Sequence, residues 1–158
     1  MGNKAEAQRN CLNTALHLLT KRDHGIEELK NKLRQKGFSR STITSTIEEC
    51  ICLNYVNDEK FSAIIVRHHR ERGYGPQYIR QKLFAVGIGE HLITRVFAEH
   101  YDSARQLHAC RQALKKKLNR LNYQADRSKI KARLFRFLYT RGFFSETISR
   151  AISAELDE

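Results

Sequence analysis

The sequence has little of what builds sheets, membrane spans and export signals. It contains one proline and no tryptophan among 158 residues. The scarcity of proline and of alternating apolar patterns argues against strands and favours helices. No apolar run approaches the ~20 residues that cross a bilayer, and residues 1–10 lack the apolar core of a signal peptide. We therefore expect a cytoplasmic, all-α chain with no membrane partner.

The cysteines lack the spacing of a metal site or a redox pair. No C-x-x-C motif occurs, and no histidine cluster completes a zinc ligand set. We expect all four to be buried or half-buried thiols in a reducing compartment. They are Cys11, Cys50, Cys52 and Cys110.

Signals of catalysis are equally scarce. His68 and His69 are adjacent, so on a helix they diverge by about 100° and do not easily chelate one metal. The segment 73–75, Gly-Tyr-Gly, lacks the strand and the Gly-Lys-Ser/Thr ending of a phosphate loop. We find no arrangement for covalent or acid–base chemistry. The sequence therefore predicts a protein that binds, is not an enzyme, and needs no metal or cofactor.

What the sequence has in excess is positive charge. Its 29 Lys and Arg residues against 17 Asp and Glu give a formal net charge of +12. A charge this high on a short chain indicates an anionic partner. Nucleic acid is the first candidate, an acidic protein surface the second and an anionic lipid the third.

One pattern of six positions occurs three times, with spacings of 50 and 55 residues. Two apolar residues four apart form a helical stripe, a glycine follows four residues later to end the helix, and an apolar residue comes directly after it. A second apolar pair then begins another helix. The three copies are Leu29, Leu33, Gly37, Phe38, Ile43 and Ile47; Ile79, Leu83, Gly87, Ile88, Ile93 and Phe97; and Leu134, Leu138, Gly142, Phe143, Ile148 and Ile152.

A further apolar stripe precedes each copy, which predicts three helices per unit. These stripes are Ala15, Leu16 and Leu19; Phe61, Ile64 and Ile65; and Leu107, Cys110, Ala113, Leu114 and Leu118. Capping residues stand before several of the helices: Asn57 with Asp58, Gly75 with Pro76, Asp102, Asp126 and Ser145. We predict three tandem three-helix repeats at 1–55, 56–101 and 102–158, forming an elongated, curved array and most simply a monomer.

The positive charge is concentrated in the third repeat. Residues 103–150 hold 13 Lys and Arg against Asp126 and Glu146, a net charge of +11, whereas residues 1–102 carry +4. A solvated helix face explains an isolated lysine run, but a segment this basic favours a polyanion-binding surface. The candidate electrostatic contacts are Lys115, Lys116, Lys117, Arg120, Arg127, Lys129, Lys131, Arg133, Arg136 and Arg141.

Aromatic residues interleave with this charge. At helical spacing we expect most of them to be core, with only an exposed tyrosine free to stack on a base. Phe135 and Phe137 are two residues apart and cannot face the same way on a helix. The set is Tyr123, Phe135, Phe137, Tyr139 and Phe144.

Cations also occupy equivalent places in the first two repeats. Arg22 matches Arg72, and Lys32 matches Lys82. A repeated cation suggests a repeated contact, and a solvent-facing position kept by duplication explains it equally well.

Several strings resemble the RecX family of bacterial recombination regulators. They are ALHLLTKRDHGIEELKNKLRQKGF at 15–38, YVND at 55–58 followed by Phe61, the segment from Gly75 to Leu83 with Gly87-Ile88, and RFLYTRGF at 136–143 followed by Ile148. The similarity covers nearly the whole chain. One departure is Gly25, where the family more often has a serine cap, so we expect a weaker cap there.

The resemblance implies tandem three-helix repeats and a specific partner. Members of the family bind the RecA recombinase, lodge along the groove of its filament on single-stranded DNA, and restrain its ATPase, strand exchange and growth in recombination, DNA repair and the SOS response. Some members also bind DNA, single- or double-stranded, and none needs a cofactor. The alternative is a sequence-independent DNA-binding protein that acts without RecA.

Overall fold

The computed structural model describes residues 2–120 and 126–156, and these residues form nine helices and no strand. None of the described helices is both long and apolar enough to cross a membrane. Tyr123 lies outside the described residues. The helices are α1 (Gly2–Lys21), α2 (Ile26–Gln35), α3 (Arg40–Cys52), α4 (Asp58–Glu71), α5 (Pro76–Ala85), α6 (Glu90–His100), α7 (Ser103–Leu118), α8 (Arg127–Thr140) and α9 (Ser145–Leu156).

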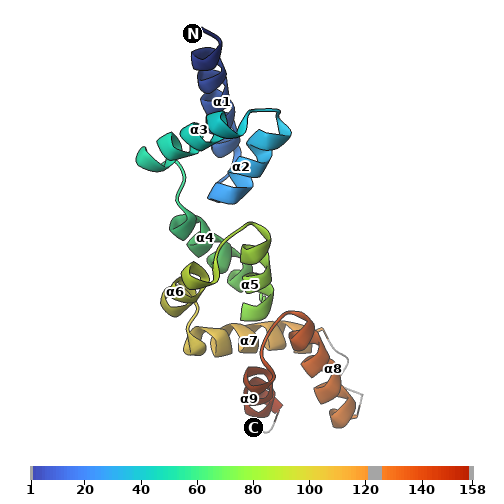
Figure 1. Cartoon of the computed structure of the whole chain (residues 1–158). Coiled ribbons are helices and arrows are strands. Elements are labelled where there is room, and N and C mark those ends of the chain that lie inside the picture. Colours follow the sequence, from blue (N-terminus) through green and yellow to red (C-terminus); the bar gives the residue numbers. More distant parts are fainter. Residues whose placement is uncertain (1, 121–125, 157–158) are drawn as a thin grey trace.

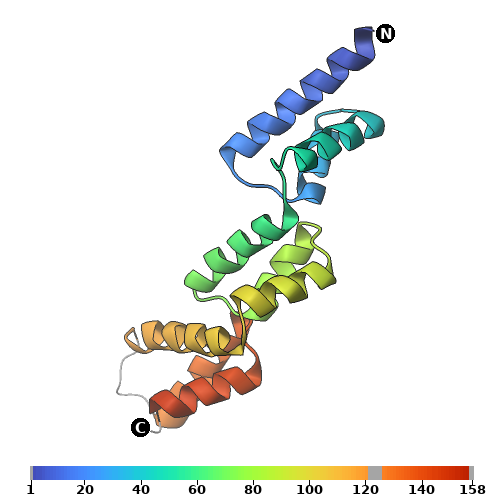
Figure 2. The ribbon, with the colours of Figure 1, turned by 90° about the vertical axis from the view of Figure 1, so that its left-hand side faces the viewer.

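The helices follow one another as three groups of three along an elongated array, with the termini at opposite ends (Figures 1 and 2). The predicted all-α fold of three tandem three-helix units is confirmed. We call α1–α3 the first unit, α4–α6 the second and α7–α9 the third. The predicted limits of the units at residues 55 and 101 remain a proposal.

The repeated glycine ends the middle helix of each unit in the same way. Gly37, Gly87 and Gly142 have φ angles of 87°, 86° and 86°. The amide of the apolar residue that follows each glycine donates to a carbonyl five residues back, as when Ile88 donates to Leu83 at 3.0 Å. This is the bond of a Schellman cap, and it needs a residue that tolerates the left-handed conformation. The sequence pattern and the turn geometry therefore agree in all three units.

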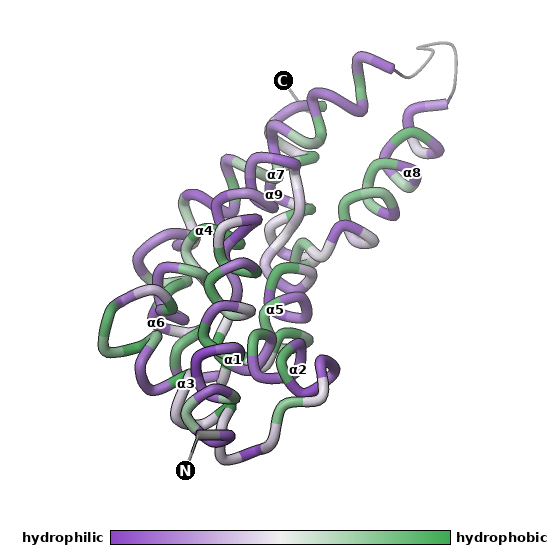
Figure 3. Tube along the Cα trace, turned by 90° about the horizontal axis from the view of Figure 1, so that it is seen from above, coloured by the Kyte–Doolittle hydropathy of each residue, from purple (hydrophilic) through white to green (hydrophobic). Residues whose placement is uncertain are grey.

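The repeated apolar positions form the core. Hydrophobic and hydrophilic residues alternate along the helices (Figure 3). Of the apolar repeat positions, only Phe38 is half-buried and the others are buried. The preceding stripes were predicted less well, because Ile64 is 39% exposed. The buried face of α4 is thus narrower than the apolar stripe in its sequence indicates.

The buried residues form two separate cores. One contains Leu29, Leu33, Ile43 and Ile47 and belongs to the first unit alone. The other runs without interruption from Phe61 in α4 to Ile152 in α9 and is shared by the second and third units. The second and third units therefore form one packed body, and the first unit is joined to it outside that core.

We expect Leu134→Ala to lower the free energy of unfolding of this shared body by roughly 2–5 kcal/mol. The side chain is fully buried in α8, so its removal leaves a cavity. Urea unfolding followed by circular dichroism measures the effect. Tyr139→Ala, on the same helix but 54% exposed, is the control and should cost far less. Equal losses in the two variants would contradict the core assignment.

Side-chain caps begin several helices as predicted. The Asn57 side chain accepts from the amides of Glu59 and Lys60, and Asp102 accepts from the amide of Arg105. Asp126 caps α8 in the same way, and Pro76 occupies the first turn of α5 after Gly75. Ser145 is different, because it is the first residue of α9 and stands inside the helix.

The first and second units meet at Gly25. This residue begins α2 without a side-chain cap, as its sequence predicts. Asp58, from the start of α4, supplies the missing acceptor: its Oδ1 receives the Ile26 amide at 2.7 Å. A Cβ on Gly25 would lie 3.1 Å from the Phe61 ring. The glycine therefore lets the two helix starts approach, and the cap comes from the neighbouring unit.

The cysteines follow expectation in three of four cases. Cys11, Cys50 and Cys110 are buried free thiols, and burial raises the pKa of each, that of Cys110 to about 12. The prediction is wrong for Cys52, which is exposed at the end of α3. The three buried thiols are thus kept in the unreactive protonated form.

Candidate functional site

The second and third units join through backbone hydrogen bonds at the start of α5. The Gly75 amide donates to the Arg141 carbonyl at 2.7 Å, and the Gln77 amide donates to the Gly142 carbonyl at 3.0 Å. Free amides at a helix start need acceptors, and here the α8–α9 turn supplies two. The docking fixes the end of α4 beside α7.

Arg141 holds the same junction from the other side. Its guanidinium donates to the carbonyls of Arg72 and Gly73 at 2.8 and 3.3 Å. The same group lies 4.9 Å from the ring centroids of both Tyr74 and Phe137. A cation between two aromatic faces is attracted electrostatically by both rings. Arg141 is therefore committed to joining the units, with fewer donors left for a partner than its charge indicates.

An aromatic cluster fills the α4–α5 turn behind this contact. The rings of Tyr74 and Tyr78 stack with centroids 4.1 Å apart, and His69 packs edge-on against both. Burial lowers the pKa of His69, and so do the positive charges of His68, Arg72 and Lys82. His69 is thus held neutral near pH 7. Across the described ranges, no three His, Cys, Asp or Glu side chains gather to hold a metal ion.

Two adjoining hollows of about 590 and 280 Å³ open between the end of α4 and the side of α7. They share five lining residues, so we treat them as one feature, the junction groove. Its described lining residues are Arg70, Glu71, Arg72, Gly73, Ala104, Arg105, His108, Ala109, Gln112, Ala113, Lys116, Lys117, Arg120, Phe137 and Arg141.

The junction groove is strongly cationic. Its described lining contains seven Lys and Arg side chains and one acid, Glu71, a formal charge of +6. Arg70 is oriented by a bond to the His100 carbonyl at 2.8 Å, and Arg105 by Asp102 at 2.9 Å. Lys116 and Arg120 have no partner among the described residues. Converging cations in a hollow suit phosphate or carboxylate groups of a larger ligand.

The structure brings together part of the predicted basic set. Lys116, Lys117, Arg120 and Arg141 from the third unit meet Arg72 from the second around the groove. Lys115 is not in the lining and instead pairs with Glu155 at 3.3 Å. Lys117 also lies 5.1 Å from the centroid of the Phe137 ring, which directs its charge to the groove wall. Consecutive residues point in different directions on a helix, so Lys115 points away from the groove that Lys116 and Lys117 line.

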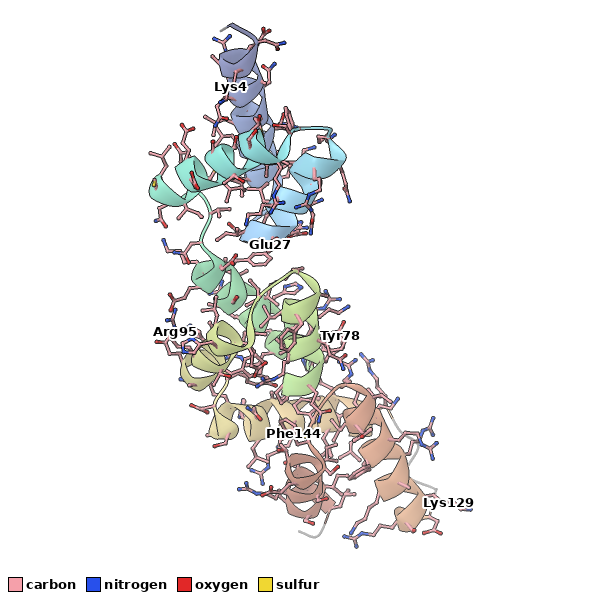
Figure 4. All side chains as sticks on the ribbon, viewed as in Figure 1. Lys4, Glu27, Tyr78, Arg95, Lys129 and Phe144 are labelled. Carbon is pink, nitrogen blue, oxygen red and sulfur yellow. The ribbon has the colours of Figure 1, made fainter. Side chains whose placement is uncertain are left out.

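The cations of α8 are outside the groove. Lys129 lies toward the outer end of the array, near the start of α8 (Figure 4). Lys131 and Arg136 line two other hollows on this helix. The remaining predicted cations of α8, Arg127 and Arg133, are exposed. The predicted single basic surface is thus divided between two places.

The repeated cations do not make repeated contacts within the chain. Arg22 pairs with Glu28 within the first unit, whereas Arg72 lies 3.3 Å from His68 and borders the groove. Lys82 lies 5.1 Å from the centroid of the Tyr78 ring. Its counterpart Lys32, on α2, is half-buried. The equivalent cations therefore have different contacts within the chain, and a repeated contact with a partner stays a prediction.

Sequence reasoning missed Arg70, Arg105 and His108, which complete the groove. Arg70 belongs to a segment that mixes acids and bases. Arg105 comes three residues after Asp102 and stands apart from the lysine run at 115–117, so local charge singled out neither arginine. Only the docking of α4 beside α7 places them with Lys116. Their positions at the end of one unit and the start of the next are the one signal that could have indicated them.

The aromatic residues of the third unit are less buried than expected. Phe135 and Phe137 are half-buried at the edge of the core, and they point to different sides as predicted. Tyr139 and Phe144 are 54% and 44% exposed. The expectation that most of this set is core is therefore wrong for the described members. The reason is that α8 packs by its leucines, leaving the aromatic positions around them at the surface.

Comparison with known families assigns the three units one by one. Residues 11–50 match the first three-helix domain of RecX, residues 57–96 the second and residues 104–152 the third. A regulatory protein RecX from Vibrio vulnificus is 34% identical over 146 residues, which cover 92% of this chain and 93% of the relative. The chain belongs to the RecX family. A RecX protein from Legionella pneumophila is 36% identical over 89% of this chain and 91% of its own length.

Solved RecX structures share the fold. The crystal structure of RecX from Lactobacillus salivarius superposes with a TM-score of 0.86 at 24% identity, covering 97% of this chain and 98% of that one. A second structure, of a regulatory protein RecX, gives a TM-score of 0.80 at 21% identity and covers 94% of this chain and 73% of the other. The three-unit arrangement is therefore common to RecX proteins of low sequence identity.

Proposed function

We propose that this RecX protein binds the filament that RecA forms on single-stranded DNA in the cytoplasm and restrains its ATPase, strand exchange and growth. It acts by binding and carries out no reaction of its own. The observation that carries the proposal is the cationic junction groove on a chain of the RecX family. Its role is in recombination, DNA repair and the SOS response.

The groove supports a partner that carries closely spaced negative charges. The lining has seven cations and one acid, Glu71, and within the described ranges only Arg105 among these cations pairs with another acid, Asp102. The remaining cations repel one another unless an anion screens them. Arginine forks in the lining suit the two oxygens of a phosphate or a carboxylate. A nucleoprotein filament offers both, as phosphates of its DNA and as acidic side chains of its protein.

The elongated shape supports a partner with a repeating surface. The three units lie in a row (Figure 1), and the second and third share one core. A two-unit body with the first unit attached at one end is long enough to reach more than one subunit of a filament. Binding across subunits slows their rearrangement, and this accounts for restraint of ATP hydrolysis and of filament growth together.

The test is the DNA-dependent ATPase of RecA. We expect the purified protein to inhibit it at less than one molecule per RecA subunit, and to slow strand exchange over the same concentrations. The control is the same assay with Leu134→Ala protein at a temperature where the body formed by its second and third units is unfolded. Unchanged ATPase and strand exchange in the presence of the native chain would show that the proposal is wrong.

The second candidate is DNA binding without RecA, which the net charge of +12 favours on its own. It predicts tight binding to bare DNA, single- or double-stranded, with a steep loss of affinity on adding salt. Comparing affinity for a RecA filament with affinity for the same bare strand separates the two. Higher affinity for the filament supports RecA modulation, and equal affinity supports the alternative.

A further inference from the structure

The outward face of α8 carries a hollow that the junction groove does not include. This hollow, of about 340 Å³, is lined by Ala132, Phe135, Arg136 and Tyr139. These positions lie at i, i+3, i+4 and i+7, so they share one face of the helix. A second hollow of about 330 Å³ adjoins it, with Ala132 and Phe135 in both. The feature is thus a surface depression centred on one aromatic ring.

Two aromatic rings in this depression are nearly parallel, one half-buried and the other exposed to solvent. The rings of Phe135 and Tyr139 are stacked, with centroids 6.2 Å apart and planes inclined by 13°. Phe135 packs against the shared core, which fixes its orientation, while Tyr139 is 54% exposed. An exposed ring of this size is not explained by packing within the chain. It offers a flat apolar surface of defined orientation.

The charge around the rings identifies the chemistry of the ligand. Arg136 lies between the two ring positions in sequence, is exposed, and has no partner among the described residues. A flat ring beside a cation suits a planar group that carries a negative charge next to it. An unpaired nucleotide has this composition, since every base has a π-face and is joined to a phosphate. A purely apolar peptide gains nothing from Arg136, and a purely acidic one gains nothing from the rings.

We propose that Tyr139 and Phe135 form a stacking platform for an unpaired base of single-stranded DNA, with Arg136 on the neighbouring phosphate. This site is separate from the junction groove, which binds phosphates without reading bases. Phe137, on another side of α8, and Arg141, directly after the end of α8, line the groove, so this helix contributes to both sites. The inference rests on the proposed function in one respect, that single-stranded DNA reaches the third unit.

The chain offers a clean spectroscopic test because it contains no tryptophan. Tyr139→Trp introduces a single indole that keeps a stacking surface. We expect oligothymidylate to quench its fluorescence at saturation, and an abasic oligodeoxynucleotide of the same length to leave the fluorescence nearly unchanged. The matched control is Phe84→Trp, on α5, where the native ring is 48% exposed and lines neither the groove nor the platform. Its emission should not respond to either oligomer.

Affinity provides the second readout. Tyr139→Ala should weaken binding of oligothymidylate between about fivefold and a hundredfold, the range for loss of one stacked base. Binding of the abasic oligomer should stay the same, since that oligomer is held by phosphates alone. Circular dichroism of each variant confirms that the helices are intact.

Three outcomes would overturn the platform. They are an unquenched indole at saturating oligothymidylate, an equal loss of affinity for both oligomers in Tyr139→Ala, and no binding of oligothymidylate at all. The assays contain no RecA, so they are independent of the ATPase test of the proposed function. A platform that fails while the ATPase is still inhibited would assign the exposed rings to a protein partner instead.

Discussion

Gly142→Ala is expected to destabilise the body formed by the second and third units by roughly 2–5 kcal/mol. The residue has a φ of 86°, where an L side chain costs roughly 1–2 kcal/mol. A Cβ would also overlap the backbone nitrogen of Tyr78 and lie 2.8 Å from its Cβ. Because backbone atoms cannot rotate away, α5 has to move. The hydrogen bonds from Gly75 and Gln77 to the turn then lengthen, at roughly 0.5–1.5 kcal/mol each.

Gly37→Ala is the matched control. Gly37 ends the middle helix of the first unit with a φ of 87°, but no atom lies within 4 Å of the position of its Cβ. This variant therefore loses stability through the left-handed backbone conformation alone, without a steric clash. We expect a loss of roughly 1–2 kcal/mol, seen in the unfolding of the first unit. The difference between the two variants isolates the contact between units.

Urea unfolding gives both free energies, and amide hydrogen exchange locates the change. In Gly142→Ala the amides of Gly75 and Gln77 should exchange faster than in the native protein, since their acceptors are in the displaced turn. In Gly37→Ala they should be unaffected. Equal destabilisation by the two substitutions, with these amides still protected, would mean that the close approach at the junction is not structurally important.

The repeated unit could be predicted from the sequence because each of its features is local. A stripe of two apolar residues, a glycine four residues later and an apolar residue after it specify a helix, its end and its cap within ten residues. The near-identical φ angles at Gly37, Gly87 and Gly142 show how closely that local code is followed. Residues buried by the same code, such as Leu134 and Leu138, were accordingly predicted correctly.

The junctions could not be predicted because their contacts join residues far apart in the chain. Asp58 caps α2 across 32 residues, and Arg141 reaches a carbonyl 69 residues away. In the sequence, Asp58 is a cap for its own helix and Arg141 is one more cation of a basic segment. Once the units are docked, each of the two side chains makes a hydrogen bond to a neighbouring unit. Gly75 and Gly142 lie against each other at the contact between two units. Their sequence positions alone do not predict this contact.

The candidate site was predicted in composition but not in shape. Net charge located the third unit, and the groove does take Lys116, Lys117 and Arg120 from it. A helix separates consecutive residues by about 100°, so a run of three lysines cannot share one site. The groove is completed by Arg70 from α4, a contribution that depends on how α4 ends beside α7.

Reversing three groove cations is expected to have the largest effect on binding. The variant combines Lys116→Glu, Lys117→Glu and Arg120→Glu, and it leaves out Lys115, which pairs with Glu155 away from the groove. Loss of three phosphate contacts on a single strand should reduce affinity by about fifty-fold near 0.15 M salt, before any repulsion from the new carboxylates. The slope of log affinity against log salt should fall by about 2.

The matched control reverses three exposed cations that lie outside the groove: Lys21→Glu, Arg40→Glu and Lys60→Glu. Both triple variants lower the formal net charge from +12 to +6, so the field of the whole chain changes equally. Lys116 and Lys117 also favour the dipole at the end of α7, as Lys21 does at the end of α1. Arg40 and Lys60, however, stand in the first turns of α3 and α4, where a carboxylate is favoured. A small loss of helix stability is therefore expected in the groove variant, and little net change in the control.

Titrating each variant with a fluorescent single strand over a range of salt concentrations, and then with a RecA filament, separates local from long-range electrostatics. A strong loss in the groove variant and a weak loss in the control assign phosphate binding to the junction groove. Equal losses in both would mean that net charge alone attracts the partner. Native affinity in the groove variant would move the contact to the cations of α8, with Lys129, Arg133 and Arg136 as the next positions to reverse. The same titrations also show how α8 contacts DNA. Its cations would bind the phosphates, whereas its exposed rings indicate contact with the bases.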